Sequence, residues 1–225
     1  VTITDANDQT PAVNVAATYT HAEAASTTFQ TYTIVDTDTT GTYTCTLGGN
    51  DAADFSASIS GKVCTVTWAA NPNFESPADS DTDNVYDITI AFSDGTNDLA
   101  AQTTAITVTD VNEAPVVANA IADASTNEDA SYSLSLSNVF SDVDSGDTCT
   151  YSMSGAPDTL TLSSGTISGT PTNDNVGAHT VTVSCSDGAL SVSDQYTLTV
   201  VNTNDAPTVS TAIADATTAE DASYS

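Results

Sequence analysis

The sequence places carboxylate and amide side chains in a short segment between an alternating apolar run and a proline. Asp110, Asn112 and Glu113 lie within four residues of one another. Carboxylate and carbonyl oxygens are the ligands that Ca²⁺, a hard cation, prefers. Related segments occur at Val1–Pro11 and at Leu198–Pro207. The three segments therefore predict linkers that bind a hard cation between successive parts of the chain.

The linkers recur at a spacing that corresponds to a small domain. Pro11, Pro115 and Pro207 are 104 and 92 residues apart, and the offset of 92 also carries Ile121–Ala124 onto Ile213–Ala216. A repeat of about 100 residues can bury its own core, so we expect tandem modules in a slice of a longer array. The expected divisions are an end strand and linker at 1–11, a module at 12–110, a linker at 111–115, a module at 116–201, a linker at 202–207 and the first strand of a following module at 208–225.

The composition and the apolar pattern predict strands. Thr and Val, whose branched Cβ suits a pleated surface, are abundant, and no segment has a sustained 3.6-residue apolar period. The alternation in 86–92 indicates a strand with one buried face, and Asp94-Gly95 and Asp187-Gly188 indicate turns. Such short strands predict an all-β sandwich in each module. The expected strands are 13–20, 28–35, 41–47, 62–68, 86–93 and 103–109, then 131–136, 148–153, 159–162, 165–168, 179–186 and 195–201.

The charge balance excludes several partners. The chain has 30 Asp and Glu residues and one basic residue, Lys62, which gives a formal net charge of −29. Such a surface repels nucleic acids and anionic membranes, and no apolar run has the length of a membrane span. We therefore expect no nucleic-acid partner and no membrane insertion in this segment. The carboxylates are either a solvated surface or cation ligands, and their positions distinguish the two.

The four cysteines occur two per module, at alternating positions that face the cores. They allow three pairings, and one bridge per module favours Cys45–Cys64 and Cys149–Cys185. The alternative is buried thiols, because free Cys is itself a core residue. Disulfides would indicate an oxidising, extracellular setting.

Motifs in order along the chain carry a family resemblance. In the first module they are Asp36–Asp38, Pro72–Asp79, Asp83–Tyr86, Ser93–Gly95 and Asp110–Pro115, and in the second they are Ser141–Asp144, Ser164–Pro171 and Ser186–Gly188. The first module resembles bacterial cadherin-like domains, and the second resembles the dystroglycan-type cadherin-like or Ig-like variety. The resemblance implies seven-stranded Greek-key sandwiches joined end to end, with calcium bound between them.

The resemblance also implies a ligand set for each junction. At the central junction the ligands would be Glu23, Glu75, Asp110, Asn112, Glu113, Asp142, Asp144 and Asp187. Before the first module they would include Asp5, Asn7, Asp8, Asp36, Asp38 and Asp94. After the second module they would be Glu128, Asp174, Asn204 and Asp205. There Asn202 replaces the leading Asp of the linker, so this junction should hold fewer ions or hold them more weakly.

Other acidic residues have simpler interpretations. Asp98, Asp123, Asp129 and Asp158 are explained as turn residues, whose side chains bond nearby backbone. The segment 79–84 alternates carboxylates like the start of an EF-hand loop, but it lacks the glycine at the sixth position and the Glu at the twelfth. An independent calcium site there stays open beside the interpretation as a turn.

The sequence offers little for catalysis. His21 and His179 stand apart, without the spacing of a zinc site, and no Ser lies in a nucleophile elbow. We expect no catalytic residues. Trp68, Tyr43 and Tyr86 could form a sugar-binding platform, but their alternation places them in the core.

The hypothesis that follows is an extracellular structural or adhesive repeat segment, on a cell surface or secreted, that calcium rigidifies between modules and that extends an adhesin or filament. Its partners would be adjacent modules, neighbouring copies in a filament or cell-surface ligands. The alternatives are a module that binds carbohydrate or protein, and a spacer in a secreted enzyme.

Overall fold

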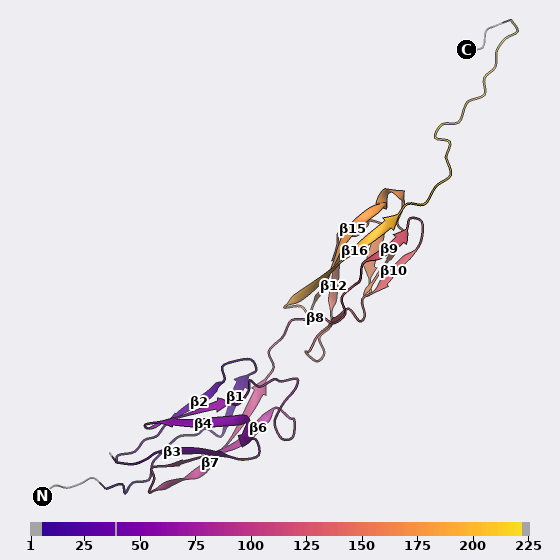
Figure 1. Ribbon diagram of the computed structural model, residues 1–225. Helices are drawn as coiled ribbons and strands as arrows, with labels where there is room; N and C mark the ends of the chain where they lie inside the picture. The colour runs from indigo at the N-terminus through magenta and orange to yellow at the C-terminus, as the bar shows by residue number, and fades with distance from the viewer. Residues whose placement is uncertain (1–5, 39, 222–225) are drawn as a thin grey trace. The chain divides into compact units, whose positions relative to one another are not determined.

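The computed structural model describes residues 6–38 and 40–221. The residues of the expected end strand up to Asp5, and the last four residues of the chain, lie outside the described part. The chain forms two compact units, one of Val1–Ala114 with Asp142–Asp147 and one of Pro115–Ser141 with Thr148–Ser225. Figure 1 shows that both units are built from strands. Among the described residues, no helix is long and apolar enough to cross a membrane.

The first unit is a sandwich of two sheets. Its strands are β1 (Thr18–Ala22), β2 (Thr28–Thr33), β3 (Thr44–Gly48), β4 (Phe55–Ser60), β5 (Val63–Trp68), β6 (Val85–Ser93) and β7 (Asp98–Thr109). The sheets have the orders β1-β7-β6-β3 and β2-β5-β4. All pairs are antiparallel except β1 with β7, which is parallel. Consecutive strands therefore alternate between the sheets except at the hairpins, as a Greek-key sandwich requires.

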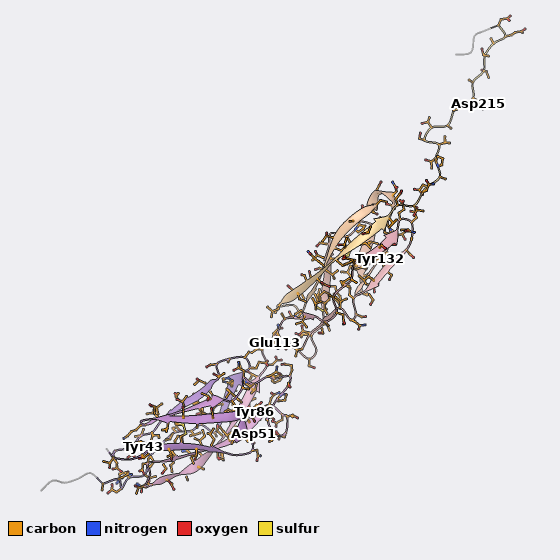
Figure 2. All side chains as sticks on the ribbon, viewed as in Figure 1. Tyr43, Asp51, Tyr86, Glu113, Tyr132 and Asp215 are labelled. Carbon is orange, nitrogen blue, oxygen red and sulfur yellow. A yellow bond between two sulfur atoms is a disulfide. The ribbon has the colours of Figure 1, made fainter. Side chains whose placement is uncertain are left out.

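The core of the first unit consists of the inward residues of both sheets. Trp68 of β5 and Tyr86 of β6 are 4% and 1% exposed, and their rings meet edge to face with centroids 4.9 Å apart. Phe55 of β4 packs on Trp68 with centroids 4.2 Å apart. Figure 2 labels Tyr86 within this unit. Of the three aromatic residues that could have formed a binding platform, Trp68 and Tyr86 are thus core residues, and Tyr43 is partly buried against the same cluster.

The second unit has the same plan, with shorter strands in its three-stranded sheet. Its strands are β8 (Val116–Val117), β9 (Ala124–Asn127), β10 (Tyr132–Ser135), β11 (Phe140–Ser141), β12 (Thr150–Ser154), β13 (Leu160–Ser163), β14 (Thr166–Gly169), β15 (Gly177–Ser186) and β16 (Ser191–Val201). Its main sheets have the orders β12-β15-β16-β9 and β10-β14-β13, and β11 pairs with β8. The pair of β9 and β16 is parallel. The described residues after β16 form no strand. The expected all-β sandwich is confirmed in both units.

The sequence pattern does not predict β4 or β9, and the reason is physical. Only Phe55 is buried in β4, which is an edge strand of small and polar residues. β9 is Ala-Ser-Thr-Asn at the edge of its sheet, and it lacks apolar alternation. The expected strand at 13–20 begins later, at Thr18, because the segment before it contributes only a bridge between Ala12 and Val35.

Two disulfides close the units, with the pairing that one bridge per module predicts. Cys45 of β3 is joined to Cys64 of β5, so this bond links the two sheets of the first unit. Cys149, just before β12, is joined to Cys185 of β15, in the neighbouring strand of the same sheet. No cysteine of the described residues is free.

We expect the Cys45→Ala/Cys64→Ala variant to lower the free energy of unfolding of the first unit by about 3 kcal/mol. The bond spans a sequence separation of 19 residues, and a cross-link of that length restricts the unfolded chain by about this amount. Trp68 is the only Trp of the chain, so its fluorescence in a urea titration with chelator reports on this unit. The Cys149→Ala/Cys185→Ala variant is the control and should leave the Trp68 transition unchanged. Equal effects of the two variants would contradict separate cores.

Candidate metal centre

The parallel pairing of β1 with β7 brings a glutamate to the start of the linker. The last residues of the two strands, Ala22 and Thr109, are partners in the ladder. Because parallel strands run in the same direction, β1 and β7 finish at the same end of the sheet, and Glu23 and Asp110 follow there. The backbone N–H of Glu23 also donates to the carbonyl of Thr109, over 3.1 Å. Strand topology thus positions residues that are 87 apart in sequence.

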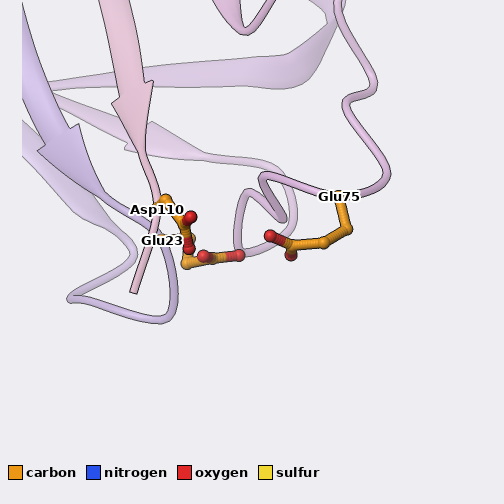
Figure 3. Close-up of side chains that lie close together, drawn as sticks. All are labelled: Glu23, Glu75 and Asp110. Atoms are coloured by element: carbon orange, nitrogen blue, oxygen red, sulfur yellow. The ribbon is translucent and has the colours of Figure 1, made fainter. Parts of the chain in front are cut away.

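Glu23 ties the linker to a loop of the same unit. Its side chain is 4% exposed. Its Oε1 accepts the N–H of Val111 over 2.9 Å, and its Oε2 accepts the N–H of Phe74 over 2.8 Å. The residue after Phe74 is Glu75, so the same bond also positions a second carboxylate. Figure 3 shows the side chains of Glu23, Glu75 and Asp110 converging, and one oxygen of each lies within 4.8 Å of the others.

A second group contains linker and loop residues. One oxygen each of Glu75, Glu113 and Asp144 lies within 4.8 Å of the others. The N–H of Glu113 donates to Oδ2 of Asp144 over 2.8 Å, and Oδ1 of Asp142 accepts the N–H of Asp144 over 3.2 Å. Glu75 belongs to both groups, so five carboxylates, those of Glu23, Glu75, Asp110, Glu113 and Asp144, form a continuous cluster. We call it the linker cluster.

The linker cluster contains buried oxygens that lack a hydrogen-bond partner. Oε2 of Glu75, Oε2 of Glu113 and Oδ1 of Asp144 are buried and have none among the described residues. A buried polar atom without a partner costs about 1–3 kcal/mol, and more when it is charged. Each of these atoms is a hard oxygen donor, and Ca²⁺ takes six to eight of them in flexible geometry. The residues present therefore fit a calcium ion.

The charges of the cluster repel one another. The pKa values of Glu75, Asp110 and Glu113 lie above their ordinary range, first because burial disfavours the ionised form and then because neighbouring carboxylates do. The only basic residue, Lys62, donates instead to the carbonyls of Asp36 and Asp38. No side-chain cation relieves the repulsion, and a bound cation would reverse the direction of these shifts.

Asp147 is one residue that the sequence analysis missed. It lies in the 142–147 loop of the first unit, and its charge adds to the repulsion that raises the pKa of Asp110, after burial and the charges of Asp144 and Glu23. Its place three residues after Asp144 was the only signal in the sequence. The amide of Asn112 donates to the carbonyl of Glu113 over 2.8 Å. Its role as a ligand stays a prediction.

A third acidic group lies in the first unit. Asp36, Asp38 and Asp94 each place an oxygen within 4.8 Å of the others. Oδ2 of Asp38 accepts the N–H of Gln9 over 2.8 Å, just as Asp144 accepts the N–H of Glu113. The same backbone arrangement thus recurs at both linkers.

Asp94, in the turn between β6 and β7, is held by hydrogen bonds. Its Oδ1 accepts the N–H groups of Thr96 and Asn97 over 2.8 and 2.7 Å. Burial would raise the pKa of Asp94, but these bonds and the amides of Asn97 and Asn7 outweigh it and lower the pKa to about 2. Asp94 is therefore ionised at neutral pH and available to a cation.

Of the remaining ligands expected before the first module, Asn7 contacts Asp94, whereas Asp8 joins no acidic group among the described residues. Asn7 donates to the carbonyl of Asp94 over 3.3 Å, and its own Oδ1 is buried without a partner. Asp8 is exposed and accepts a bond from Gln9, and among the described residues it joins no group of three candidate ligands. Asp5 lies outside the described residues.

The second unit repeats the glutamate arrangement. β9 is parallel to β16, with Asn127 opposite Val201, so Glu128 follows at the edge beside Asn202. Glu128 is 2% exposed, and its Oε1 accepts the amide of Asn202 and the N–H of Thr203, both over 2.6 Å. Its Oε2 is buried without a partner.

The structure does not assemble the rest of the expected third junction. Asp174, Asn204 and Asp205 are exposed, and among residues 6–38 and 40–221 no group of three candidate carboxylate ligands includes Glu128, Asp174 or Asp205. In the second unit, Asp187 accepts the N–H groups of Ala189 and Leu190 through Oδ1, each over 2.6 Å. The assignment of these residues as ligands stays a prediction.

Two other acidic residues bond within the second unit, but to partners distant in sequence and not to the nearby backbone that the interpretation as turn residues predicts. Oδ1 of Asp123 accepts the N–H of Thr197 over 2.6 Å, and Oδ1 of Asp158 accepts the amide of Asn175 over 2.8 Å. Neither belongs to a group of three acidic side chains in the described part of the chain. Asp123 is therefore a suitable control for the linker carboxylates.

Comparisons with known proteins agree on the fold. Residues 114–201 match the family model described as "Putative Ig domain". Among solved structures, the chain is similar to the EC1-2 segment of human protocadherin-24, with a TM-score of 0.58 and 18% identity over 89% of this chain and 100% of that one. The fold is that of cadherin or Ig-like modules. Domains 1–5 of protocadherin gamma B2 match with a TM-score of 0.54 and 21% identity, over 89% of this chain and 42% of that one.

A search of curated proteins found no match. The chain spans only 52%, 42% and 42% of the first three solved structures that it matches. The identities with these three structures are 21%, 21% and 14%, so the likeness shows the fold alone.

We expect Asp110→Asn to weaken calcium binding about tenfold or more, because it removes one charge from a site whose affinity depends on ligand charge. Asp123→Asn removes the same charge outside the linker cluster and should bind calcium like the wild type. Calorimetric titration of the three proteins, after removal of calcium by chelation, measures the difference. Identical isotherms for the two variants would show that Asp110 is not a ligand.

Proposed function

We propose that this chain is a non-catalytic extracellular repeat segment that Ca²⁺ rigidifies between modules, and that it extends a surface adhesin or filament. The observation that carries the proposal is the set of buried, unpartnered oxygens on Glu75, Glu113 and Asp144. One of these residues lies in the linker and another follows β11, so an ion held by them would connect segments on either side of Pro115.

The proposed mechanism is mechanical. Glu23, Glu75, Asp110, Glu113 and Asp144 would hold the ion, and the ion would supply the positive charge that the cluster lacks. Bound cations stabilise the folded arrangement by linkage, by about 2.7 kcal/mol when the free ion is at 100 times its dissociation constant. The linker residues would then lose the freedom of a flexible hinge, and the modules would keep a fixed orientation.

The extracellular setting is supported by the disulfides and by the fold. Both pairs of cysteines are bonded, and disulfides persist in oxidising compartments. Similar structures include extracellular cadherin domains of protocadherin gamma B2 and the ectodomain of human desmocollin-1. An array of such modules would serve as an extended stalk or fibre, whose partners are adjacent modules, neighbouring copies or cell-surface ligands.

We expect calcium to fix the orientation of the two units. With calcium, residual dipolar couplings from both units should fit one alignment tensor, because the linker is held. After chelation the two units should need separate tensors, while the couplings within each unit still fit its own structure, since the cores are apolar and closed. Glu113→Gln should behave like the chelated protein, and Asp123→Asn like the wild type. A single tensor in chelator would contradict calcium-dependent rigidity.

A further inference from the structure

The segment between β5 and β6 contains a fourth acidic group, outside the linker cluster. One oxygen each of Asp79, Asp81 and Asp83 lies within 4.8 Å of the others. The three residues alternate in sequence, at the spacing of positions 1, 3 and 5 of an EF-hand loop. We call the segment 79–84, which carries this group, the Asp79 loop.

Asp79 is a buried carboxylate, and one of its oxygens has no hydrogen-bond partner among the described residues. Its side chain is only 3% exposed. Its Oδ2 accepts the N–H of Asp83 over 2.8 Å, whereas its Oδ1 is buried and has no partner among the described residues. A buried carboxylate oxygen normally bonds a donor or a cation. The carboxylate of Asp79 also lies close to those of Asp81 and Asp83, and the repulsion among the three favours binding of a cation.

Another buried carboxylate anchors the loop. Asp51, labelled in Figure 2, is 3% exposed; its Oδ1 accepts the N–H of Ser80 over 2.8 Å and its Oδ2 accepts the N–H of Asp87 over 2.7 Å. These bonds tie Ser80 of the loop and Asp87 of β6 to one side chain, on either side of Asp81 and Asp83. Asp51 also adds negative charge beside the group.

We propose that Asp79, Asp81 and Asp83 bind a Ca²⁺ ion within the first unit, separate from the linker cluster. The missing glycine is not an obstacle. Asn84, at the sixth position, adopts a left-handed backbone with φ of +64°, as Asn tolerates better than most residues. The twelfth position is Ile90, which is buried in β6 and is no ligand. With one acidic ligand fewer than an EF-hand, the site should bind in the range of extracellular modules, roughly 10⁻⁴ to 10⁻³ M.

The Asp79 loop also supports the loop that carries Glu75. The amide of Asn84 donates to the carbonyl of Phe74 over 2.8 Å, and the N–H of Phe74 donates to Glu23. An ion on the Asp79 loop would therefore stabilise the base from which Glu75 reaches the linker cluster. The site itself does not depend on the proposed role of the linker.

The test is a calcium titration of the ¹⁵N-labelled chain, followed by the amide signals of residues 79–85. They should shift and saturate in the wild type and in Asp110→Asn, whose linker is impaired. Asp81→Asn should weaken this response at least tenfold, because it removes one of three charged ligands. Asp98→Asn removes an exposed carboxylate of the same unit and should respond like the wild type.

Two results would overturn the proposal. One is the absence of shifts in these signals in the wild type at about ten times the expected dissociation constant. The other is an equal response of Asp81→Asn and Asp98→Asn. The side chain of Asp81 is exposed, so its replacement leaves the core intact, and the amide signals of β6 verify this. Asp79→Asn is a second variant, which keeps an acceptor for Asp83 and should also lose the response.

Discussion

In each unit, one early strand pairs in parallel with the last strand, and both units depend on this constraint. β1 with β7, and β9 with β16, end at a common edge, so the residue after the first strand lies beside the start of the following linker. In both units that residue is a buried glutamate, Glu23 or Glu128, and it accepts a backbone N–H from the linker. The linker is therefore tied to its unit by backbone topology before any ion is considered.

Burial of negative charge is the second constraint. Apolar cores and disulfides close each unit independently, and they leave the carboxylates at loops and linkers, where the chain has one basic residue to offer. The first unit nevertheless buries several of these carboxylates, including Asp38, Asp79 and Asp144. Burying a charge without a partner costs free energy. The stability of the first unit therefore depends on how well its buried carboxylates are neutralised.

Much of this could be read from the sequence, and the exceptions have physical causes. The strict alternation of apolar residues in β6 predicted a half-buried strand, and the recurring linkers predicted where carboxylates gather. The pairing of β9 could not be read, because a short polar edge strand has no apolar pattern, and with it the contact of Glu128 and Asn202 was hidden. The unpartnered oxygen of Asp79 depends on burial by distant segments, such as the one that carries Asp51, which sequence spacing does not encode.

The two glutamates show how one substitution changes the need for a cation. Asp110 cannot donate a hydrogen bond when ionised, so it only adds repulsion to the carboxylate of Glu23. Asn202, at the corresponding position of the next linker, donates its amide to Glu128 over 2.6 Å. The amide partly satisfies the buried carboxylate and removes one negative charge from that edge. The same backbone arrangement therefore demands more positive charge at the linker of Asp110 than at the linker of Asn202.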